Sequence, residues 1–559
     1  MTRKLTRSSA VRFTSIAVST VIIALAALAQ TWATGKSQDE PVKNNAAPVA
    51  GPTNPSMASP PAAVTYSSGG YAPTSIAMGD LNHDGKADIV VANWCAAKNS
   101  CTSGSVSVLL GNGDGSFQMA TTILSGGKDT SSVVIGDFNK DGKLDAAVAN
   151  YCGLKGSGCK AGGHATVSVL LGSGDGTLRG AVSYALLGIS PKSLSVGDFN
   201  RDGKLDLAVA DCFVEPDFCH DSVEILLGNG DGTFQPAVRY DAGPGDCMNS
   251  PVVADFNGDG KLDLAVADPC QKFVSILLGN GDGTFQPAMQ YASGKDPWVI
   301  AAGDFSGDGK IDLAGVEYGA FNVLMLLGQG NGTFGTAAEY PTGEFAPTSI
   351  AVGDFNHDGK LDLVVANNCL IPQQPCKSNG TVAVMLGKGD GTFQIPVNYD
   401  SGGLNRTAQV QMPEEPVAVD DVNGDGRADL IVANQCADST CANGSIAVLL
   451  GNGDGTFQGQ VVTNHYDTST ALTATPNPST FGQPVTFSAT VASAGPGVPT
   501  GKVKFVDGTL ALGSSALRGG IAALTTSNLA SGTHPITAQY LGDAGDDKST
   551  SPVVNQVVQ

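Results

Sequence analysis

The sequence is short of basic residues and of charge in general. Lysine and arginine number 31 against 52 aspartate and glutamate residues, which gives a formal net charge of −21. A surface this acidic repels phosphate backbones, which excludes nucleic acid as the expected partner. Charged residues make up only 15% of the chain and glycine supplies 73 of its 559 residues. This composition favours turn-rich β structure over helical bundles.

Histidine and catalytic motifs are also scarce. The six histidines include two, His83 and His357, that fall inside acidic loops described below. The sequence has no Gly-x-Ser-x-Gly elbow, no His-Glu-x-x-His and no phosphate-binding Gly-Lys-Ser/Thr. We therefore expect no catalytic residues and no enzyme. The alternatives are a propeller-based polysaccharide lyase or hydrolase and a purely structural component of the cell envelope.

Only one long apolar run occurs, from Ile16 to Ala29, and it follows a basic start. Small residues that permit cleavage come after it, as in an export signal. We predict a signal peptide over residues 1–33 and a flexible linker rich in Pro, Ala and Ser over 34–61. The mature protein is then secreted or held at the bacterial cell surface, with no membrane span. A retained anchor is the alternative, although the run is shorter than the about 20 residues of a full span.

The twelve cysteines are few for the length but even in number. Five pairs are close in sequence: Cys95/Cys101, Cys152/Cys159, Cys212/Cys219, Cys369/Cys376 and Cys436/Cys441. Cys247 and Cys270 complete the set. Local pairing predicts disulfide bonds formed in an oxidising compartment, with free thiols as the alternative. Zinc is not expected because Cys-x2-Cys spacing with His partners is absent.

The strongest positive feature is a nine-residue cluster, Asp-x-Asn-x-Asp-Gly-x-x-Asp, that occurs seven times. Its copies begin at Asp80, Asp137, Asp198, Asp255, Asp304, Asp354 and Asp421. Each copy supplies three carboxylates and usually one amide, which is an oxygen-rich set suited to Ca²⁺. Gly85 and its equivalents at position 6 permit a sharp turn. An EF-hand is excluded because position 12 is Val or Gly instead of Glu.

We expect about seven Ca²⁺ sites, built from the side chains at positions 1, 3, 5 and 9 and the carbonyl at position 7. The fifth site, with Ser306 at position 3, should bind most weakly. The predicted ligands are Asp80, Asn82, Asp84, Lys86, Asp88, Asp137, Asn139, Asp141, Lys143, Asp145, Asp198, Asn200, Asp202, Lys204, Asp206, Asp255, Asn257, Asp259, Lys261, Asp263, Asp304, Ser306, Asp308, Lys310, Asp312, Asp354, Asn356, Asp358, Lys360, Asp362, Asp421, Asn423, Asp425, Arg427 and Asp429.

Each cluster lies between short apolar strands, and the sixth copy shows the unit. Strands are expected at 348–354, 363–367, 381–386 and 393–399, with a Gly-rich turn before the last. Seven such four-stranded units predict an all-β, seven-bladed β-propeller over residues 62–465. Ring closure is left open by the sequence, since both 62–68 and 457–463 resemble a fourth strand. The recurrent Gly-Asn-Gly-Asp-Gly-Thr-Phe motif is interpreted as the hairpin turn instead of a phosphate or sugar site.

These residues carry a family resemblance. The loop GDFNGDGKLDLAVAD followed by VSILLGNGDGTFQPA resembles the FG-GAP/VCBS-type repeats of secreted bacterial proteins, and is similar to the repeats of the integrin α-chain propeller. Local departures are Leu178 in place of Phe and Asn331 in place of Asp in the turn. The resemblance implies calcium binding, a seven-bladed propeller and a role in recognition or adhesion, without naming the ligand.

Residues 467–559 lack both cysteine and the acidic loop, so they form a separate unit. About seven short strands of alternating polarity predict a β-sandwich. The segment resembles bacterial Ig-like domains, and a spacer role is expected.

Blade geometry suggests where a partner would bind. In antiparallel blades the acidic loops lie on one face and the cysteine-containing loops on the other. The predicted aromatic residues of the second face are Trp94, Tyr151, Phe213, Phe218, Tyr318, Tyr71, Trp298 and Phe345. We expect this face to recognise a protein or glycan at the cell surface.

Overall fold

The computed structural model describes residues 63–98, 101–153, 164–215, 218–243, 245, 249–317, 320–343, 346–367, 380–403, 416–436, 443–459, 468–493, 498–542 and 548–559. The predicted signal peptide and linker lie outside these residues. The chain divides into two compact units, Met1–Gln460 and Val461–Gln559, and each is described by itself. The described residues form β-strands without helices, so none of them belongs to a helix able to cross a membrane.

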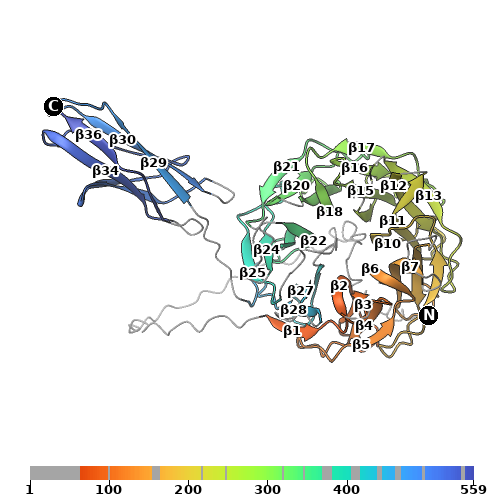
Figure 1. The fold of residues 1–559 in the computed structure, drawn as a ribbon. Helices are drawn as coiled ribbons and strands as arrows, with labels where there is room; N and C mark the ends of the chain where they lie inside the picture. The colour runs from red at the N-terminus through yellow and green to blue at the C-terminus, as the bar shows by residue number, and fades with distance from the viewer. Residues whose placement is uncertain are drawn as a thin grey trace, which may run out of the picture. The chain divides into compact units, whose positions relative to one another are not determined.

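The first unit consists of seven four-stranded antiparallel sheets, which confirms the predicted β-propeller. Figure 1 shows the sheets around a ring, with the first strand of each blade toward the centre. Blade 1 has β2 (Tyr71–Gly79), β3 (Asp88–Cys95), β4 (Ser105–Leu109) and β5 (Thr121–Leu124). Blade 2 has β6 (Gly127–Gly136), β7 (Asp145–Gly153), β8 (Thr166–Leu170) and β9 (Val182–Ala185). Blade 3 has β10 (Ser193–Gly197), β11 (Asp206–Glu215), β12 (Phe218–Leu226) and β13 (Val238–Gly243).

The remaining blades repeat this order. Blade 4 has β14 (Asn249–Ala254), β15 (Asp263–Asp268), β16 (Phe273–Leu277) and β17 (Met289–Ala292). Blade 5 has β18 (Pro297–Gly303), β19 (Asp312–Glu317), β20 (Asn322–Leu326) and β21 (Ala338–Pro341). Blade 6 has β22 (Pro347–Gly353), β23 (Asp362–Asn367), β24 (Thr381–Met385) and β25 (Val397–Asp400). Blade 7 has β26 (Val417–Asp420), β27 (Asp429–Asn434), β28 (Ser445–Leu449) and β1 (Val64–Ser67).

The ring closes through the N-terminal strand. β1 pairs antiparallel with β28, from Val64 opposite Val448 to Ser67 opposite Ser445. It is therefore the fourth strand of blade 7, although it precedes blade 1 in the sequence (Figure 1). The competing segment, 457–463, contributes only a bridge from Phe457 to Gly451 within the described residues. This pairing decides between the two closures that the sequence left open.

Strand burial follows position in the blade. Second and third strands are largely buried, and β15 is buried throughout, because each has a neighbouring strand on both sides and a blade on both faces. Fourth strands such as β9 are mostly exposed, in the pattern of an outer edge. The cores lie between blades: Ala77 and Val90 of blade 1 pack with Ile135 and Val148 of blade 2. Adjacent blades therefore share one hydrophobic core at each junction.

At most junctions between blades, a cluster of aromatic side chains packs one blade against the next. The turn residue Phe234 of blade 3 packs edge-to-face against Phe138 and Tyr184 of blade 2, with ring centroids 5.7 Å apart in both pairs. Phe285, Phe334, Phe393 and Phe457 repeat this arrangement at the next four junctions. Such pairs add about 0.5–1.5 kcal/mol each beyond their burial.

The junction between blades 1 and 2 uses aliphatic side chains at the same three positions. Leu81, Ile123 and Leu178 pack in one cluster there. Leu178 is the departure from the turn motif noted in the sequence. Leu81 and Ile123 likewise stand where most other junctions have aromatic residues, so this junction keeps an apolar core of different shape.

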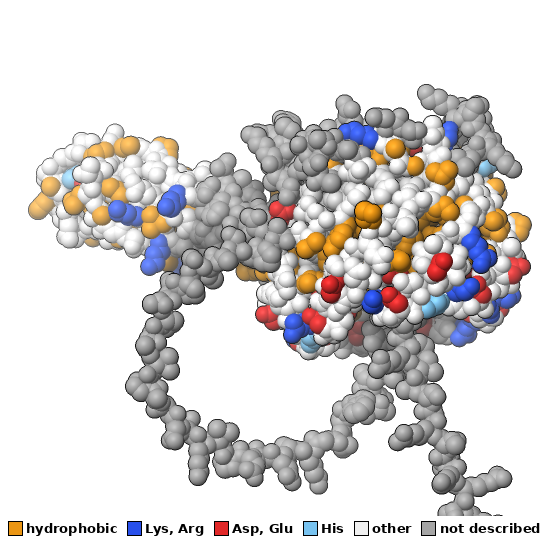
Figure 2. All heavy atoms as spheres, turned by 90° about the horizontal axis from the view of Figure 1, so that it is seen from below, with side chains coloured by type: hydrophobic (Ala, Val, Ile, Leu, Met, Phe, Trp, Pro, Cys, Tyr) orange, Lys and Arg blue, Asp and Glu red, His pale blue; other side chains and the backbone are white. Residues whose placement is uncertain are grey.

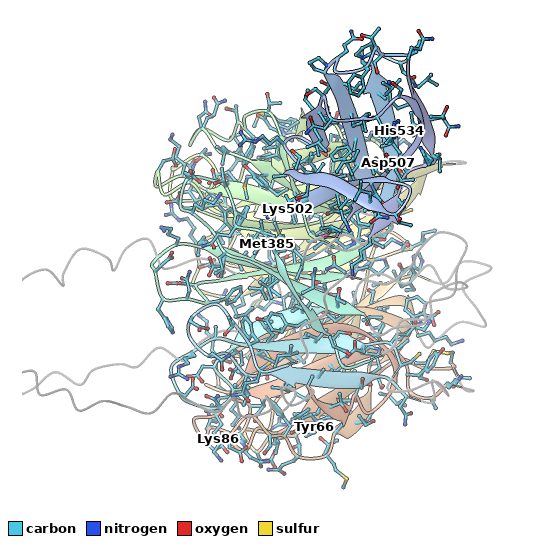
Figure 3. The ribbon with its side chains drawn as sticks, turned by 90° about the vertical axis from the view of Figure 1, so that its left-hand side faces the viewer. Tyr66, Lys86, Met385, Lys502, Asp507 and His534 are labelled. Atoms are coloured by element: carbon cyan, nitrogen blue, oxygen red, sulfur yellow. A yellow bond between two sulfur atoms is a disulfide. The ribbon has the colours of Figure 1, made fainter. Side chains whose placement is uncertain are left out.

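The second unit is the predicted Ig-like β-sandwich. One sheet has β29 (Thr468–Thr475), β30 (Val485–Ser493) and β33 (Ile521–Thr526). The other has β31 (Lys502–Asp507), β32 (Leu510–Ala516), β34 (Gly532–Tyr540), β35 (Ser549–Thr550) and β36 (Val554–Val558). Phe487 and Phe505 lie in the core between the sheets. His534 and Asp507 lie side by side, with Nδ1 of the imidazole 2.6 Å from the carboxylate (Figure 3).

Candidate functional site

The acidic loops connect the first and second strands of every blade. In blade 1, Asp80 Oδ1 and Asn82 Oδ1 both accept hydrogen bonds from the Asp84 amide, at 3.1 and 3.0 Å. Asp80 Oδ2 accepts a further bond of 2.8 Å from the Gly85 amide. Gly85, for which a sharp turn was expected, has φ +82°, a left-handed conformation that glycine adopts without strain. The side chains of Asp80 and Asn82, at positions 1 and 3, therefore lie close together at the open end of the loop.

The ninth residue of each loop is buried and joins two parts of its blade. Asp88 is 0% exposed. Its Oδ2 accepts a bond of 2.9 Å from the Leu81 amide, and its Oδ1 accepts one of 2.8 Å from the Gly111 amide. The ninth aspartate of every other blade makes the same pair of bonds, to an amide of its own loop and to the equivalent turn glycine. The acidic loop and the hairpin turn are therefore held together by one carboxylate.

Burial makes the ionised form of this carboxylate costly. Desolvation raises the pKa of Asp88, and the negative charges of Asp84 and Asp80 add to the effect. The same cause raises the pKa to about 6 in five other blades. These residues are Asp145, Asp206, Asp263, Asp362 and Asp429. Each loop thus concentrates negative charge around a buried group.

The basic residue at position 7 points back over the loop. Lys86 Nζ lies 3.3 Å from Asp84 Oδ2, and all seven loops have this ion pair between positions 7 and 5. The Lys86 side chain also passes close to Gly113 in the hairpin turn. Figure 2 shows charged side chains of both signs gathered along one rim of the propeller, and Figure 3 places Lys86 toward a rim. Exposed pairs of this kind contribute little to stability.

The donor set of each loop fits a hard cation, although the side chains are engaged in protein contacts. Among the described residues, no three Asp, Glu, His or Cys side chains converge closely enough to hold a metal ion. The oxygens of Asp80 and Asn82 converge, whereas Asp84 faces Lys86 and Asp88 faces two amides. Ion binding would replace the exposed Lys86–Asp84 pair and would compensate the charge buried at Asp88.

The opposite face carries the loops between second and third strands. Cys95 and Cys101 form a disulfide bond there, as predicted. Cys212, Cys270 and Cys436 are also disulfide-bonded, to partners whose side chains lie outside the described part of the chain. The other predicted cysteine pairs fall wholly or partly outside it. Covalent bonds therefore stiffen several loops of this face.

Several predicted aromatic residues of this face are in the described residues. Trp94 and Tyr151, from adjacent blades, pack edge-to-face with centroids 5.2 Å apart, and both are half-buried. Phe213 stacks beneath the guanidinium of Arg239 at 3.9 Å. Tyr71 is half-buried, and Trp298 packs against the core between blades 5 and 6. The side chains of Phe218, Tyr318 and Phe345 lie outside the described set.

One pattern on this face was missed in the sequence. The second-strand residue five positions after the ninth aspartate is Asn in blades 1, 2, 6 and 7, but an acid in blades 3, 4 and 5. The Asn93 amide donates to Ser107 Oγ at 3.0 Å. In blade 3 these two positions are Asp211 and Glu224, both buried. Burial and the Glu224 charge raise the pKa of Asp211 to about 8.

A groove of about 650 Å³ lies along the outer strands of blades 3 and 4. Its lining includes His220, Arg239, Asp241, Gln286 and Gln290. Blade 3 differs from the others because β11 and β12 continue as a long hairpin, from Leu207 opposite Leu226 to Glu215 opposite Phe218. The groove thus lies beside this extended hairpin.

Family comparisons agree with this architecture. The FG-GAP-like repeat profile matches residues 95–148, 210–266, 255–315 and 304–365, and the FG-GAP repeat profile matches 72–109, 346–385 and 417–449. The profile of the bacterial Ig-like domain (group 3) matches residues 472–559. No curated protein sequence matches the chain.

The similarity of this chain to solved structures is distant. The NanB sialidase of Streptococcus pneumoniae is 11% identical with a TM-score of 0.37, over 70% of each chain. The biofilm matrix protein Bap1 of V. cholerae is 12% identical with a TM-score of 0.38, over 72% of this chain and 90% of that one.

Proposed function

Because this chain belongs to the FG-GAP repeat proteins and ends in a bacterial Ig-like domain, we propose that it is an exported, calcium-stabilised propeller that recognises a protein or glycan at the bacterial cell surface. The proposal depends on the difference in structure between the two faces of the propeller. One face has seven acidic loops, each anchored by a buried aspartate, and the other has disulfide-bonded loops with half-buried aromatic residues.

The loop chemistry supports calcium binding. Each loop offers carboxylate and carbonyl oxygens, the ligands that Ca²⁺ prefers, at the spacing of a compact loop. Asp80 and Asn82 would hold the ion at the loop mouth, and Asp88 would couple it to the hairpin turn through Gly111. A bound Ca²⁺ would supply positive charge where burial leaves carboxylates poorly solvated. At millimolar Ca²⁺, sites of extracellular type add about 0.4–1.4 kcal/mol each to folding stability.

Export is supported by the chemistry of the cysteines. Disulfide bonds persist in oxidising compartments and are rare in the reducing cytosol. Cleavage within the predicted signal peptide is tested by sequencing the mature N-terminus, where an intact Met1 would contradict it. In this proposal the Ig-like unit has the role of a spacer.

The binding proposal is tested on the purified full-length mature protein with and without EGTA. Calorimetry should detect uptake of about seven Ca²⁺ ions, and EGTA should lower the melting temperature of the propeller. Arrays of glycans and cell-surface proteins should show saturable binding that EGTA weakens. Replacing Asp80 and Asp84 with Asn should remove one ion from the stoichiometry. Absence of both ion uptake and a saturable ligand would contradict the proposal, and turnover of a bound glycan would point to the enzyme alternative.

A further inference from the structure

The aromatic pair of blades 1 and 2 is joined by a lysine. Lys192, at the entrance to blade 3, donates a hydrogen bond of 2.8 Å to the Tyr151 hydroxyl. Its ammonium also lies 5.2 Å from the centroid of the Tyr151 ring. Trp94 packs against the same tyrosine from blade 1. We refer to Trp94, Tyr151 and Lys192 as the aromatic–lysine patch.

The backbone of the aromatic–lysine patch is held by the strands of blades 1, 2 and 3. Trp94 and Tyr151 directly follow the buried Asn93 and Asn150, at equivalent positions in β3 and β7. The Lys192 amide donates to the carbonyl of Ala210 at 2.9 Å, which ties its backbone to blade 3. The three side chains remain half-buried, so they present partly exposed surface on a stiff base. Preorganised aromatic residues bind with a small loss of side-chain entropy.

The loops around the patch carry three lysines in an otherwise acidic protein. The described parts of the loops that blades 1 and 2 place on this face span 68–75, 94–98, 101–105, 125–131, 151–153, 164–166 and 186–193. They contain Lys98, Lys128 and Lys192, with Asp129 as their acid. Asp211 and Glu224 of blade 3 border the last of these loops, because they accept hydrogen bonds from the amides of Ser190, Leu187 and Gly188. Both carboxyl groups are buried, and burial raises the pKa of each. Blades 4 and 5 place the buried Asp268 and Glu317 on the same face. In a chain of net charge −21, this sector is a local site for an anion.

We propose that the aromatic–lysine patch binds an acidic saccharide, in which a carboxylated sugar ring stacks on Trp94 or Tyr151 and its carboxylate pairs with Lys192. This inference rests on the proposed function of the face and specifies its ligand class. Sugar rings present a C–H face that packs on aromatic rings, and a carboxylate forms a charge-assisted hydrogen bond with an ammonium group. The ligand is placed at blades 1 and 2 because the two aromatic rings and Lys192 lie together there.

The test uses the full-length mature protein in millimolar Ca²⁺ and three probes: galacturonic acid hexamer, hyaluronan hexamer and sialyllactose. Each is compared with a neutral counterpart, namely the carboxyl-reduced hexamers and lactose. At least one acidic probe should bind, and its neutral counterpart should bind at least tenfold more weakly. Trp94→Ala and Tyr151→Ala should weaken binding of that acidic probe at least tenfold. Lys192→Gln should abolish the preference for the acidic form.

Lys272→Ala is the matched control. Lys272 is an exposed lysine in the loop of blade 4 on the same face, where it pairs with Asp296 at 3.1 Å. Its replacement should leave binding unchanged. Trp94→Phe and Tyr151→Phe keep a ring in place and should retain most of the affinity, provided that melting temperatures match the wild type.

The outcomes separate this inference from the proposed function. Binding only to neutral glycans, to a surface protein or to an acidic peptide such as polyglutamate would overturn the inference and leave recognition by this face intact. Equal binding by wild type and the Trp94 and Tyr151 variants would also overturn it. Failure of every glycan and protein to bind would overturn both.

Discussion

The buried carboxylate of Asp88 accepts a 2.8 Å hydrogen bond from the amide of Gly111, which lies 23 residues later in the chain. A side chain at position 111 would collide with the carbonyl oxygen of Ala87, so glycine is required for this approach. The pair joins the acidic loop to the hairpin turn, and the bond recurs in all seven blades.

Asp88→Asn should destabilise the propeller even in EGTA. Asparagine has a single side-chain acceptor, so one buried amide, of Leu81 or Gly111, would lose its partner. A loss of about 1–3 kcal/mol in unfolding free energy is expected. Chemical denaturation in EGTA measures it without an ion contribution. Asp114→Asn, in the exposed turn, is the control and should have a much smaller effect; equal effects would argue against a special role for Asp88.

Ser306→Asn should strengthen the weakest proposed calcium site. Position 3 is Asn in the other six loops. In blade 1 its side-chain oxygen and a carboxylate oxygen of the first aspartate accept hydrogen bonds from the same amide. Restoring this oxygen should raise the affinity of one binding step several-fold in calorimetric titration, because Ca²⁺ affinity follows the number of oxygen ligands. The reciprocal Asn82→Ser should weaken one step, and unchanged titrations for both variants would contradict a ligand role for position 3.

Phe234→Leu should loosen the junction between blades 2 and 3. Phe234 is 7% exposed and makes edge-to-face contacts with Phe138 and Tyr184. Loss of both contacts and the resulting gap should cost about 1–3 kcal/mol in denaturation experiments. Phe481→Leu, in the Ig-like unit, changes a residue that is 70% exposed and should cost under about 0.5 kcal/mol.

Asp211→Asn should stabilise the protein at alkaline pH. The pKa of Asp211 is raised to about 8 by burial and by Glu224, whereas an aspartate in the unfolded chain titrates near about 3.9. The folded state then holds more protons between these values, so its stability falls as pH rises from about 4 to about 8. An asparagine amide at 211 would face Glu224 as the Asn93 amide faces Ser107.

Thermal unfolding at pH 5 and pH 8 checks this prediction. The gain from Asp211→Asn should be larger at pH 8 and should shrink at pH 5. Asn93→Asp, the reverse change in blade 1, should introduce a loss that grows with pH. A gain that is independent of pH would show that the charge of Asp211 is not responsible.

Removing β1 should open the ring. A chain that begins at Ser68 lacks the outer strand of blade 7 and the Tyr66–Phe117 contact across the closure, whose centroids are 5.7 Å apart. Its melting temperature should fall and it should self-associate through the exposed edge of β28. A chain that begins at Ala63 is the control, and a peptide of residues 62–68 should restore stability by strand addition. Equal melting of the two chains would contradict closure by β1.

Much of the propeller could be predicted from the sequence because its repeats are local. The acidic loop, the glycine at its sixth position and the turn before Phe234 each depend on residues close together in the chain. Closure could not be decided, since 62–68 and 457–463 have the same strand pattern and pairing with β28 is a long-range choice. The Asp88–Gly111 bond was also missed, because both residues were explained by other roles. A usable signal existed: the ninth position is Asp in every loop, even where the third position changes to Ser306.

The order of synthesis gives the closure of blade 7 a further consequence. Val64 emerges from the ribosome or a secretion channel long before its partner Val448. β1 therefore stays unpaired until nearly the whole propeller has been synthesised. Until then it can associate with the last blade of a second molecule, which would link two chains by strand exchange. Assembly of the ring is thus most vulnerable to crowding at its final step.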